Sequence, residues 1–575
     1  MKIIRPSSMD EDNYTARWRV LLLALLVAMT ALVGRAVYLQ VLDKQFLKQQ
    51  GDLRHVGIMP VPAHRGRILD RNGELLAVSS PVKSIWISPK EFLKEEVPAA
   101  KLKAFADYVG IPVAEVRKKI GSNEERSFTY IKRRMNPEQA DQAMALGLPG
   151  VYAEREYRRY YPTGEVTSHI LGLTNIDDKG QEGMELAFNA SLAGVDGAKR
   201  IVRDGKRRII EAMEDIKLPV SGKDVTLSID ERLQYLAYRE LKQAVQQNRA
   251  KSGSMVLLDS HTGEVLALVN APSFNPNARA KAKDNVSRNR AITDLFEPGS
   301  TMKPFAVACA LELGLTRPDA VFHIGSQLHV GQNVVKDTHS YGSLDVAGIL
   351  QKSSNIGVTQ IALKVPPKKF WAFYNNLGFG QPLDTSFPGE ARGRLPSYQG
   401  WNAFEQATLS FGYGVATSTL QLGRAYMAFA NGGVIPMVSL LKRTEPAESH
   451  RIMSTRTAGT IRSMLERVVS REGTALKAAV PGYRVAGKTG TVKKSGRHGY
   501  TNSYMALFAG LAPASNPRLV MVVMIDEPNA GEYYGGVVSA PVFSGVMEGA
   551  LRLLNIAPDA QPLTPLIASR QDEPA

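Results

Sequence analysis

The region that organises this chain is Phe296-Glu297-Pro298-Gly299-Ser300-Thr301-Met302-Lys303-Pro304-Phe305. An apolar run over 305–313 follows it and predicts a helix directly behind Ser300. Residues three apart share one face of a helix, so Ser300 and Lys303 are expected to meet. A serine hydroxyl becomes a useful nucleophile when a base takes its proton, and a lysine can be that base if burial lowers its pKa towards neutrality. The sequence therefore predicts an activated serine beside the positive field of a helix N-terminus.

Two later motifs set this tetrad apart from chance matches. Ser353-Ser354-Asn355 begins 53 residues after Ser300, and Lys488-Thr489-Gly490-Thr491 begins 133 residues after Asn355. An S-x-x-K tetrad opening a helix, then S-x-N, then K-T-G before a strand is the active-site pattern of penicillin-binding enzymes. Other short matches lack this order or context: Ser80-Pro81-Val82-Lys83, Lys251-Ser252-Gly253, Ser273-Phe274-Asn275, Ser287-Arg288-Asn289 and Lys494-Ser495-Gly496.

Length and composition describe a large, ordinary globular protein. A chain of 575 residues predicts three or four domains, and an apolar fraction of 44% supplies ample core. The net charge of +16 is spread without a long basic run, so nucleic acid is not expected as a partner. The single cysteine, Cys309, excludes an intrachain disulfide and is expected to be a small buried residue. Because His64 and His169 are isolated, we expect no metal and no cofactor.

An apolar segment over 20–38 predicts a membrane-spanning helix. About twenty helical residues rise roughly 30 Å, the thickness of a hydrocarbon core. Trp18 and Tyr38 bracket the segment, as aromatic residues do at membrane interfaces. A cleaved signal peptide is the alternative, but no small-residue cleavage site follows and the run is long. Arginines within residues 1–19 favour a cytoplasmic N-terminal tail, although basic residues also follow the segment.

The region after the anchor contains short elements. Asn72-Gly73 between two apolar runs predicts a hairpin. Arg65, Asp70 and Arg71 are expected to face water, the alternative being a buried ion network. Amphipathic patterns predict helices over 99–109, over 137–146, and from Gly180-Gln181-Glu182-Gly183-Met184-Glu185 to about residue 192.

Beyond a linker at 219–224 the pattern changes to longer strands and helices. The predicted strands are 225–230, 254–259, 264–271, a strand at Lys488, 503–511 and 518–525, and the last three favour antiparallel pairing. The predicted helices are 232–247, a helix-rich stretch over 344–430, and 540–554. Residues 557–575 are rich in proline, alanine and polar residues, so we expect a disordered tail.

These residues resemble the class B penicillin-binding proteins, above all the division-specific members of Gram-negative bacteria. The likeness covers nearly the whole chain, including the Arg65-Gly66 to Asp70-Arg71-Asn72-Gly73 block, Gly412-Tyr413-Gly414 and Tyr533-Tyr534-Gly535-Gly536. It implies an α+β protein with a single N-terminal transmembrane helix, an elongated pedestal for dimerisation or partner binding over 39–218, and a transpeptidase domain over 219–556. In the family, this last domain holds a five-stranded antiparallel sheet flanked by helices.

The resemblance also implies a peptidoglycan D,D-transpeptidase that releases D-Ala and is inhibited covalently by β-lactams. The implied catalytic residues are Ser300, Lys303, Ser353, Asn355 and Lys488. The implied substrate-binding residues are Thr489, Gly490, Thr491, Tyr533 and Tyr534, although a core role suits the two tyrosines equally.

The implied partners are peptidoglycan stem peptides, β-lactams, a membrane-embedded glycan polymerase of the FtsW type and other division proteins. The implied place is the inner membrane at the septum, with the catalytic domain in the periplasm. Two other classes remain open. One is a serine acyl-hydrolase, either a D,D-carboxypeptidase or a β-lactamase, and the other is a non-catalytic scaffold or sensor that binds β-lactams.

Overall fold

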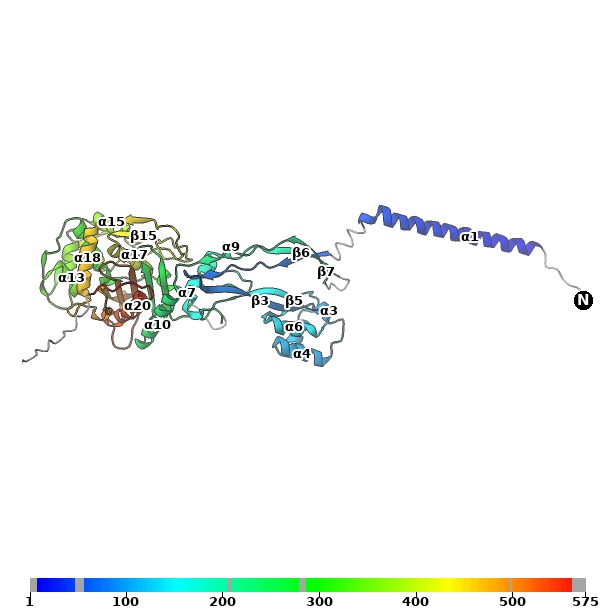
Figure 1. Cartoon of the computed structure of the whole chain (residues 1–575), viewed down its shortest axis with the longest axis horizontal. Helices are drawn as coiled ribbons and strands as arrows, with labels where there is room; N and C mark the ends of the chain where they lie inside the picture. Colours follow the sequence, from blue (N-terminus) through cyan, green and yellow to red (C-terminus); the bar gives the residue numbers. More distant parts are fainter. Residues whose placement is uncertain (1–7, 47–55, 204–208, 279–285, 497–498, 561–575) are drawn as a thin grey trace, which may run out of the picture. The chain divides into compact units, whose positions relative to one another are not determined.

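The computed structural model describes residues 8–46, 56–203, 209–278, 286–496 and 499–560. Most of the expected disordered tail, 557–575, therefore lies outside the described residues. The chain divides into two compact units (Figure 1). The first unit comprises 1–64, 82–156 and 195–220, and the second comprises 65–81, 157–194 and 221–575.

The chain begins with a long apolar helix, α1 (Ser8–Val37), which continues as one π-helical turn, η1 (Tyr38–Leu42). Its segment Thr15–Leu42 has a hydropathy of 2.4 and is long and apolar enough to cross a membrane. Within the described residues it is the one such helix. The helix therefore fits the predicted single-pass anchor, although a signal sequence would meet the same criteria of length and composition.

The first unit also contains two groups of paired strands. One is a three-stranded sheet in the order β1-β6-β7, and in the other the end of β3 pairs with β4 and β5. Helices α3, α4 and α6 lie beside β3 and β5 in Figure 1, and α5 packs against α4 and β4. Ile85, Phe105, Val116 and Ile131 belong to one buried core. Helices α4 and α6 lie where the sequence predicted them. The elements are β1 (Val56–Val61), β3 (Leu75–Ile87), β4 (Thr129–Met135), β5 (Val151–Tyr160), β6 (Gly197–Arg203), β7 (Ile209–Lys217), α3 (Pro89–Phe92), α4 (Ala99–Val109), α5 (Val113–Gly121) and α6 (Pro137–Ala145).

The predicted hairpin at Asn72-Gly73 is confirmed: β2 (Ile68–Leu69) pairs antiparallel with the start of β3, and Gly73 has a positive φ of 95°. The predicted strand over 225–230 is wrong in extent, since β8 covers only Val225–Thr226 and pairs parallel with β2. Asp230 instead caps the next helix by accepting the Arg232 N–H, so the chain leaves the extended conformation before it. The predicted helix to residue 192 is divided into α8 (Gly183–Ala187) and α9 (Asn189–Leu192).

The expectation that Arg65, Asp70 and Arg71 face water is wrong. Arg65 is 2% exposed and forms hydrogen bonds to the Glu185 carboxylate at 2.7 and 2.9 Å. Arg159 binds the other oxygen of Glu185 at 2.6 Å, and all three side chains are buried. Asp70 is fully buried, while the partly exposed Arg71 pairs with Glu264. The error arose because these partners lie far away in the sequence.

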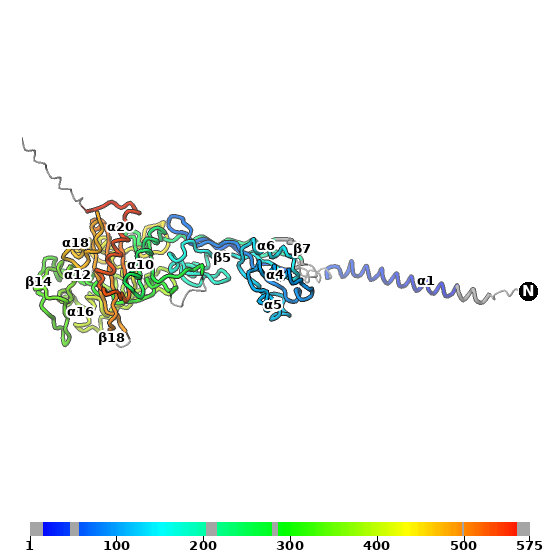
Figure 2. The backbone as a smooth tube through the Cα atoms, turned by 90° about the horizontal axis from the view of Figure 1, so that it is seen from below, coloured from blue at the N-terminus to red at the C-terminus, as the bar shows by residue number. Residues whose placement is uncertain are grey.

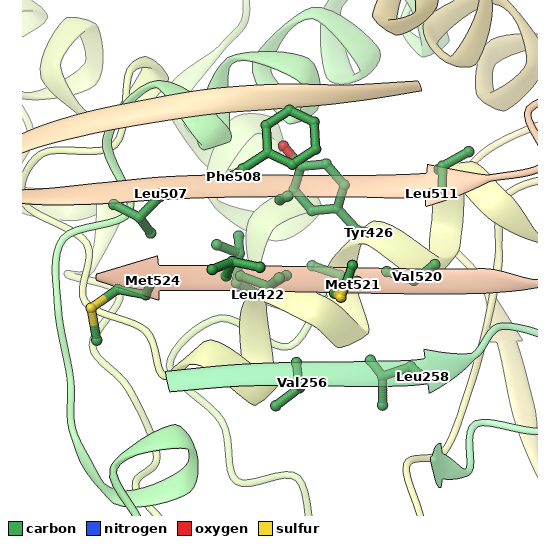
Figure 3. Close-up of a cluster of buried hydrophobic side chains, with 14 of the residues drawn as sticks. Val256, Leu258, Leu422, Tyr426, Leu507, Phe508, Leu511, Val520, Met521 and Met524 are labelled. Carbon is green, nitrogen blue, oxygen red and sulfur yellow. The ribbon is translucent and has the colours of Figure 1, made fainter. Parts of the chain in front are cut away.

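The second unit is built on a five-stranded antiparallel sheet in the order β10-β9-β19-β18-β17, which confirms the predicted architecture. Successive residues of a strand point to opposite faces. In β9, Val256 and Leu258 lie against Gly423 of α17, whereas Gly253 lies against α10. Figure 3 shows α17 side chains packed on β9, β18 and β19, and Figure 2 shows α10 beside α20. The sheet is therefore covered by helices on both faces.

The remaining elements of the second unit surround this sheet and position the predicted site. Cys309 is completely buried, as predicted. The sheet strands and the helices that cover them are β9 (Ser252–Asp259), β10 (Val265–Ala271), β17 (Ala486–Gly496), β18 (Gly499–Ala512), β19 (Leu519–Asp526), α10 (Glu231–Gln247), α17 (Thr419–Ala430) and α20 (Ala540–Leu553). The other helices are η2 (Gly164–Val166), α7 (Ser168–Leu171), α11 (Arg290–Thr293), η4 (Gly299–Met302), α12 (Lys303–Glu312), α13 (Val346–Lys352), α14 (Asn355–Ala362), α15 (Pro367–Asn376), η5 (Tyr398–Gly400), α16 (Ala403–Ser410), α18 (Thr455–Val468), η6 (Leu476–Ala478) and α19 (Gly535–Val538). The short strands are β11 (Val321–Ile324), β12 (Leu328–Val330), β13 (Asn333–Val335), β14 (Gly342–Asp345), β15 (Val434–Pro436) and β16 (Ser449–Arg451).

Candidate active site

Ser300 lies in the 3-10 turn η4, which runs directly into α12. The α-helix proper begins at Lys303, so Ser300 precedes the helix instead of standing in its first turn. Pro304 follows at the helix N-terminus, where its missing N–H costs no intrahelical hydrogen bond. The Ser300 side chain is half-buried.

Two glycines bring the serine turn against strand β17. A Cβ on Gly299 would lie 2.3 Å from Val492 Cγ2, and a Cβ on Gly490 would lie 3.1 Å from the Pro298 carbonyl oxygen. Gly299 also has a positive φ of 56°, which suits glycine. The glycine of the K-T-G motif therefore permits the close approach of the serine turn to β17.

Lys303 is fully buried, and its Nζ donates hydrogen bonds to the Ser353 carbonyl oxygen and, at 3.1 Å, to Ser353 Oγ. Burial lowers the pKa of the Lys303 ammonium to about 7, while the negative charge of Asp337 opposes that shift. An amine with this pKa is largely available as a base near neutral pH. Within the described residues, Lys303 Nζ donates to Ser353, so the direct Ser300–Lys303 contact stays a prediction.

Ser353 stands between α13 and α14 in a left-handed conformation, with φ of 60° and ψ of 38°. A non-glycine residue in this region costs free energy, and such strain is found preferentially at functional sites. The conformation ends α13 and presents Ser353 to Lys303. Hydrogen bonds from Lys303 to Ser353 thereby connect the S-x-x-K motif to the S-x-N motif.

Asp337 joins this group, and sequence reasoning missed it. Its carboxylate accepts hydrogen bonds from Ser354 Oγ and from the backbone N–H groups of Asn355 and Ile356. A carboxylate at the start of α14 is stabilised by the unpaired N–H groups there. Asn355 Nδ2 donates to the Lys336 carbonyl oxygen at 3.0 Å, so the same loop fixes the S-x-N asparagine.

Lys488 is also completely buried, and its pKa is lowered well below the ordinary value by burial and then by the positive charge of Lys303. Its Nζ lies 3.3 Å from the Thr489 carbonyl oxygen and 3.4 Å from Thr489 Oγ1. A protonated Lys303 therefore disfavours a proton on Lys488.

The hydroxyls of the third motif are held by two neighbouring segments. Thr489 Oγ1 lies 2.9 Å from Thr474 Oγ1, and Thr491 Oγ1 accepts the Gly535 N–H at 3.1 Å. Accepting that bond leaves the Thr491 hydroxyl proton available for donation.

The two predicted tyrosines lie beside this third motif. Tyr504, Tyr533 and Tyr534 form a stack with centroid spacings of 4.2 and 4.6 Å. Tyr534 is 49% exposed and Tyr533 half-buried, so neither is a core residue.

The Gly412-Tyr413-Gly414 sequence lies directly behind the serine turn. The Gly299 N–H donates to the Gly412 carbonyl oxygen at 3.2 Å, and a Cβ on Gly412 would meet the Gly299 backbone at 2.2 Å. The Gly414 N–H donates to Glu297 Oε1 at 2.8 Å. This loop therefore supports the residues that precede Ser300.

Comparison with known proteins agrees with this geometry. Residues 253–548 match the family described as Penicillin binding protein transpeptidase domain, and residues 60–227 match the Penicillin-binding Protein dimerisation domain. The chain belongs to the class B penicillin-binding proteins. It is 43% identical over 548 residues to the probable peptidoglycan D,D-transpeptidase PenA of Neisseria meningitidis, covering 94% of this chain and 93% of the relative. It is 42% identical over 564 residues to the peptidoglycan D,D-transpeptidase FtsI of Escherichia coli, covering 97% and 96%.

Solved structures give the same relation. The apo transpeptidase domain of penicillin-binding protein 3 from Burkholderia pseudomallei is 44% identical, with a TM-score of 0.54, and the match covers 58% of this chain and 98% of that one. Penicillin-binding protein 3 from Mycobacterium tuberculosis, solved in complex with aztreonam, is 27% identical, with a TM-score of 0.68 and coverage of 87% and 98%.

The site of this class B penicillin-binding protein suits acyl transfer. It combines the Ser300 hydroxyl with two buried lysines of lowered pKa, a bridging Ser353 hydroxyl and the Thr491 hydroxyl. Within the described residues, no group of His, Cys, Asp and Glu is arranged to hold a metal ion.

Proposed function

We propose that this chain is a peptidoglycan D,D-transpeptidase that cross-links stem peptides through an acyl-enzyme on Ser300. The observation that carries the proposal is the placement of the serine turn on β17 beside a buried Lys303 whose pKa is about 7. A buried lysine of this kind can act as a base, because its amine is neutral in a large fraction of enzyme molecules near neutral pH. The near full-length identity to two D,D-transpeptidases supports the same assignment.

In the acylation step, Ser300 Oγ attacks the carbonyl carbon of the penultimate D-Ala and its proton passes to Lys303 Nζ. The backbone N–H groups of Ser300 and Thr491 form the oxyanion hole, where they stabilise by hydrogen bonds the negative charge that develops on the carbonyl oxygen. The peptide C–N bond then breaks, and Ser353 relays a proton from Lys303 to the departing amine of the terminal D-Ala. The Lys303–Ser353 hydrogen bonds supply the path for that proton.

In the transfer step, the amine of a second stem peptide attacks the ester carbonyl of the acyl-enzyme. A new peptide bond forms, the ester bond breaks, and the proton lost by the amine returns to Ser300 Oγ through Lys303. Lys488 is proposed to hold the local electrostatics of the site, and burial together with the charge of Lys303 lowers its own pKa. The reaction balances without a cofactor.

Five residues are proposed to hold the substrate or lie beside it. Thr489 and Thr491 donate their hydroxyl hydrogens to the terminal carboxylate, and Asn355 binds the peptide amide. Tyr533 and Tyr534 form a wall of the cleft, in keeping with their partial exposure. The same groups would bind β-lactams, whose reactive amide and carboxylate resemble the D-Ala-D-Ala end.

Covalent labelling with fluorescent penicillin tests this function. The full-length protein should be labelled, and Ser300→Ala should abolish labelling while Ser80→Ala leaves it unchanged. Rapid loss of the label would favour an acyl-hydrolase, and an absence of labelling in the unaltered chain would favour a non-catalytic scaffold. A lasting adduct, together with cross-linking of a stem pentapeptide to an added amine acceptor, would establish the transpeptidase.

We further propose the placement of the chain in the cell. Residues 1–19 form a cytoplasmic tail, 20–38 the anchor, 39–218 the pedestal and 219–556 the transpeptidase domain in the periplasm. The similarity to FtsI supports a role in the septum. Cysteines introduced before and after α1 would report the orientation, because a membrane-impermeant thiol reagent should label only the position after the helix.

A transpeptidase without its own polymerase needs nascent glycan, and we propose that a membrane-embedded polymerase of the FtsW type supplies it through contact with the anchor. Ala24, Ala28, Ala31 and Gly34 supply small residues for close helix approach. Replacing 20–38 with an unrelated spanning helix should leave penicillin labelling intact but abolish septal localisation. A hybrid that still supports division would show that the segment is a simple tether.

A further inference from the structure

A cavity of about 430 Å³ opens at the end of the central sheet, apart from the candidate active site. It lies where α17 ends, where α18 begins, and beside the turns that connect β9 to β10 and β18 to β19. Its lining is His261, Ala430, Asn431, Gly432, Val434, Arg451, Thr455, Arg462, Ser515, Asn516 and Pro517. None of these residues belongs to the catalytic motifs. Thr491 pairs with Ala506, and β18 continues from there for six residues, about 20 Å, to the cavity end.

The lining contains two arginines and no carboxylate. Arg451 is held in place, because its Nη1 donates to the carbonyl oxygens of Gly432 and Met453 at 2.8 and 3.1 Å. Arg451 is exposed, and its charge also lowers the pKa of Glu312. Within the described residues its Nε and Nη2 make no hydrogen bond and so can donate to another acceptor. Its guanidinium is therefore already oriented before any ligand arrives.

Arg462 is half-buried on α18, and within the described residues no hydrogen bond or salt bridge is found for its guanidinium. The nearest opposite charge, Glu466, is occupied by Arg484, which binds both of its oxygens at 2.8 and 2.9 Å. Burial and the positive charge of Arg484 lower the pKa of Arg462, whereas Glu466 raises it. A guanidinium in this setting gains from an added anion.

Two further features describe what the cavity would accept. The lining also includes His261 and four amide or hydroxyl side chains: Asn431, Thr455, Ser515 and Asn516. A single water needs only about 10–15 Å³ on this measure of volume, so about 430 Å³ leaves room for more than a phosphate group. The α18 N-terminus adds little, because Glu312 already accepts the Ser454 N–H there.

We propose that this cavity binds a phosphorylated sugar, with Arg451 and Arg462 holding the phosphate and the four amide and hydroxyl side chains contacting the sugar hydroxyls. Guanidinium forks match the oxygens of phosphate geometrically, and a dianion suits a lining with two positive charges better than a carboxylate does. The site is independent of the proposed transpeptidase chemistry.

Calorimetric titration of the full-length protein, previously acylated with a β-lactam to block Ser300, tests the proposal. Glucose 1-phosphate should bind, inorganic phosphate should bind more weakly, and glucose should not bind. Equal affinity for glucose 1-phosphate and inorganic phosphate would overturn the sugar contact, and no binding of either would overturn the site.

Arg462→Ala should weaken glucose 1-phosphate binding about 10- to 100-fold, as expected for the loss of hydrogen bonds to a charged group. Arg462→Lys keeps the positive charge but lacks the paired guanidinium donors. Its affinity for glucose 1-phosphate should lie between those of the parent protein and Arg462→Ala. Arg317→Ala is the matched control, because Arg317 is an exposed arginine of the same unit outside the cavity. Undiminished penicillin labelling of each variant would show that it is folded. Equal binding by Arg462→Ala and Arg317→Ala would overturn the assignment.

Discussion

Lys303 and Lys488 are two lysines in one buried site, and burial explains the role proposed for each. Neither side chain is exposed to solvent, so the charged form of each is disfavoured. Asp337 opposes this effect at Lys303, whereas Lys303 itself adds to it at Lys488. The pKa of Lys303 therefore settles near the pH at which the enzyme must take and return a proton.

The rate of acylation should follow the neutral form of Lys303. Because its pKa of about 7 lies below the ordinary value, the base is present above pH 7 and lost as the pH falls. The second-order rate of penicillin labelling should thus drop about tenfold per pH unit below about 7 and level off above it. Lys303→Arg should fail almost as severely as Lys303→Ala, since arginine does not deprotonate. A flat pH profile would show that Lys303 acts only through its charge.

The Thr491 hydroxyl should contribute to recognition of the terminal carboxylate. Thr491→Val removes one hydrogen bond to a charged group, worth roughly 1.5–3 kcal/mol, so acylation should slow about 10- to 150-fold. Thr491→Ser keeps the hydroxyl and should stay near the parent rate. An ester analogue of the substrate separates the roles, because equal losses on acid and ester would mean that Thr491 only supports the loop at Gly535.

At this scale the sequence was informative where a residue belongs to an ordered motif. Ser300, Ser353 and Lys488 could be selected from several short matches because order and flanking pattern are visible in one dimension. Asp337 could not, because it acts through residues 17 to 19 positions away, and the intervening β14 and α13 do not reveal which loop returns to α14. The exposure of Tyr534 likewise depends on packing that no local pattern encodes.

At the scale of elements, the close contact between the serine turn and β17 is possible because Gly299 and Gly490 place no side chains between them. The central strands and amphipathic helices were predictable, since period-2 and period-3.6 patterns follow directly from burial. The 3-10 turn at Ser300 was not, because close contact with Val492 and Gly412 selects it. The length of β8 was predicted wrongly, because the Asp230 cap of the next helix competes with the extended conformation.

Gly490→Ala should impair acylation through this contact. The added Cβ would lie 3.1 Å from both the Pro298 carbonyl oxygen and Thr301 Cγ2, so the turn that carries Ser300 must move away from β17. Labelling with penicillin should slow at least tenfold while thermal stability falls only modestly, because the sheet itself is unchanged. The matched control is Gly459→Ala in α18, where a Cβ meets open space and should stabilise by about 0.5–1 kcal/mol. Parent-like labelling of Gly490→Ala would contradict the argument.

At the scale of the whole molecule, contacts do not follow the order of the chain. Segments 65–81 and 157–194 belong to the same compact unit as 221–575, although the family match for the dimerisation domain covers 60–227. The buried pairing of Glu185 with Arg65 and Arg159 spans up to 120 residues of sequence within this unit. A sequence shows three charged residues there, and only the fold shows that one carboxylate pairs with both guanidinium groups.

Glu185 should accordingly be far more important for stability than an ordinary surface carboxylate. Glu185→Ala leaves two buried guanidinium groups without their counter-charge, which costs about 3–5 kcal/mol when a buried pair is broken. Glu548→Ala removes an exposed partner of Arg552 on α20 and should cost under about 0.5 kcal/mol. Thermal unfolding of the full-length protein in detergent, followed by loss of penicillin labelling, compares the two. If Glu185→Ala unfolds at the temperature of Glu548→Ala, the buried network does not hold segments 65–81 and 157–194 in their unit.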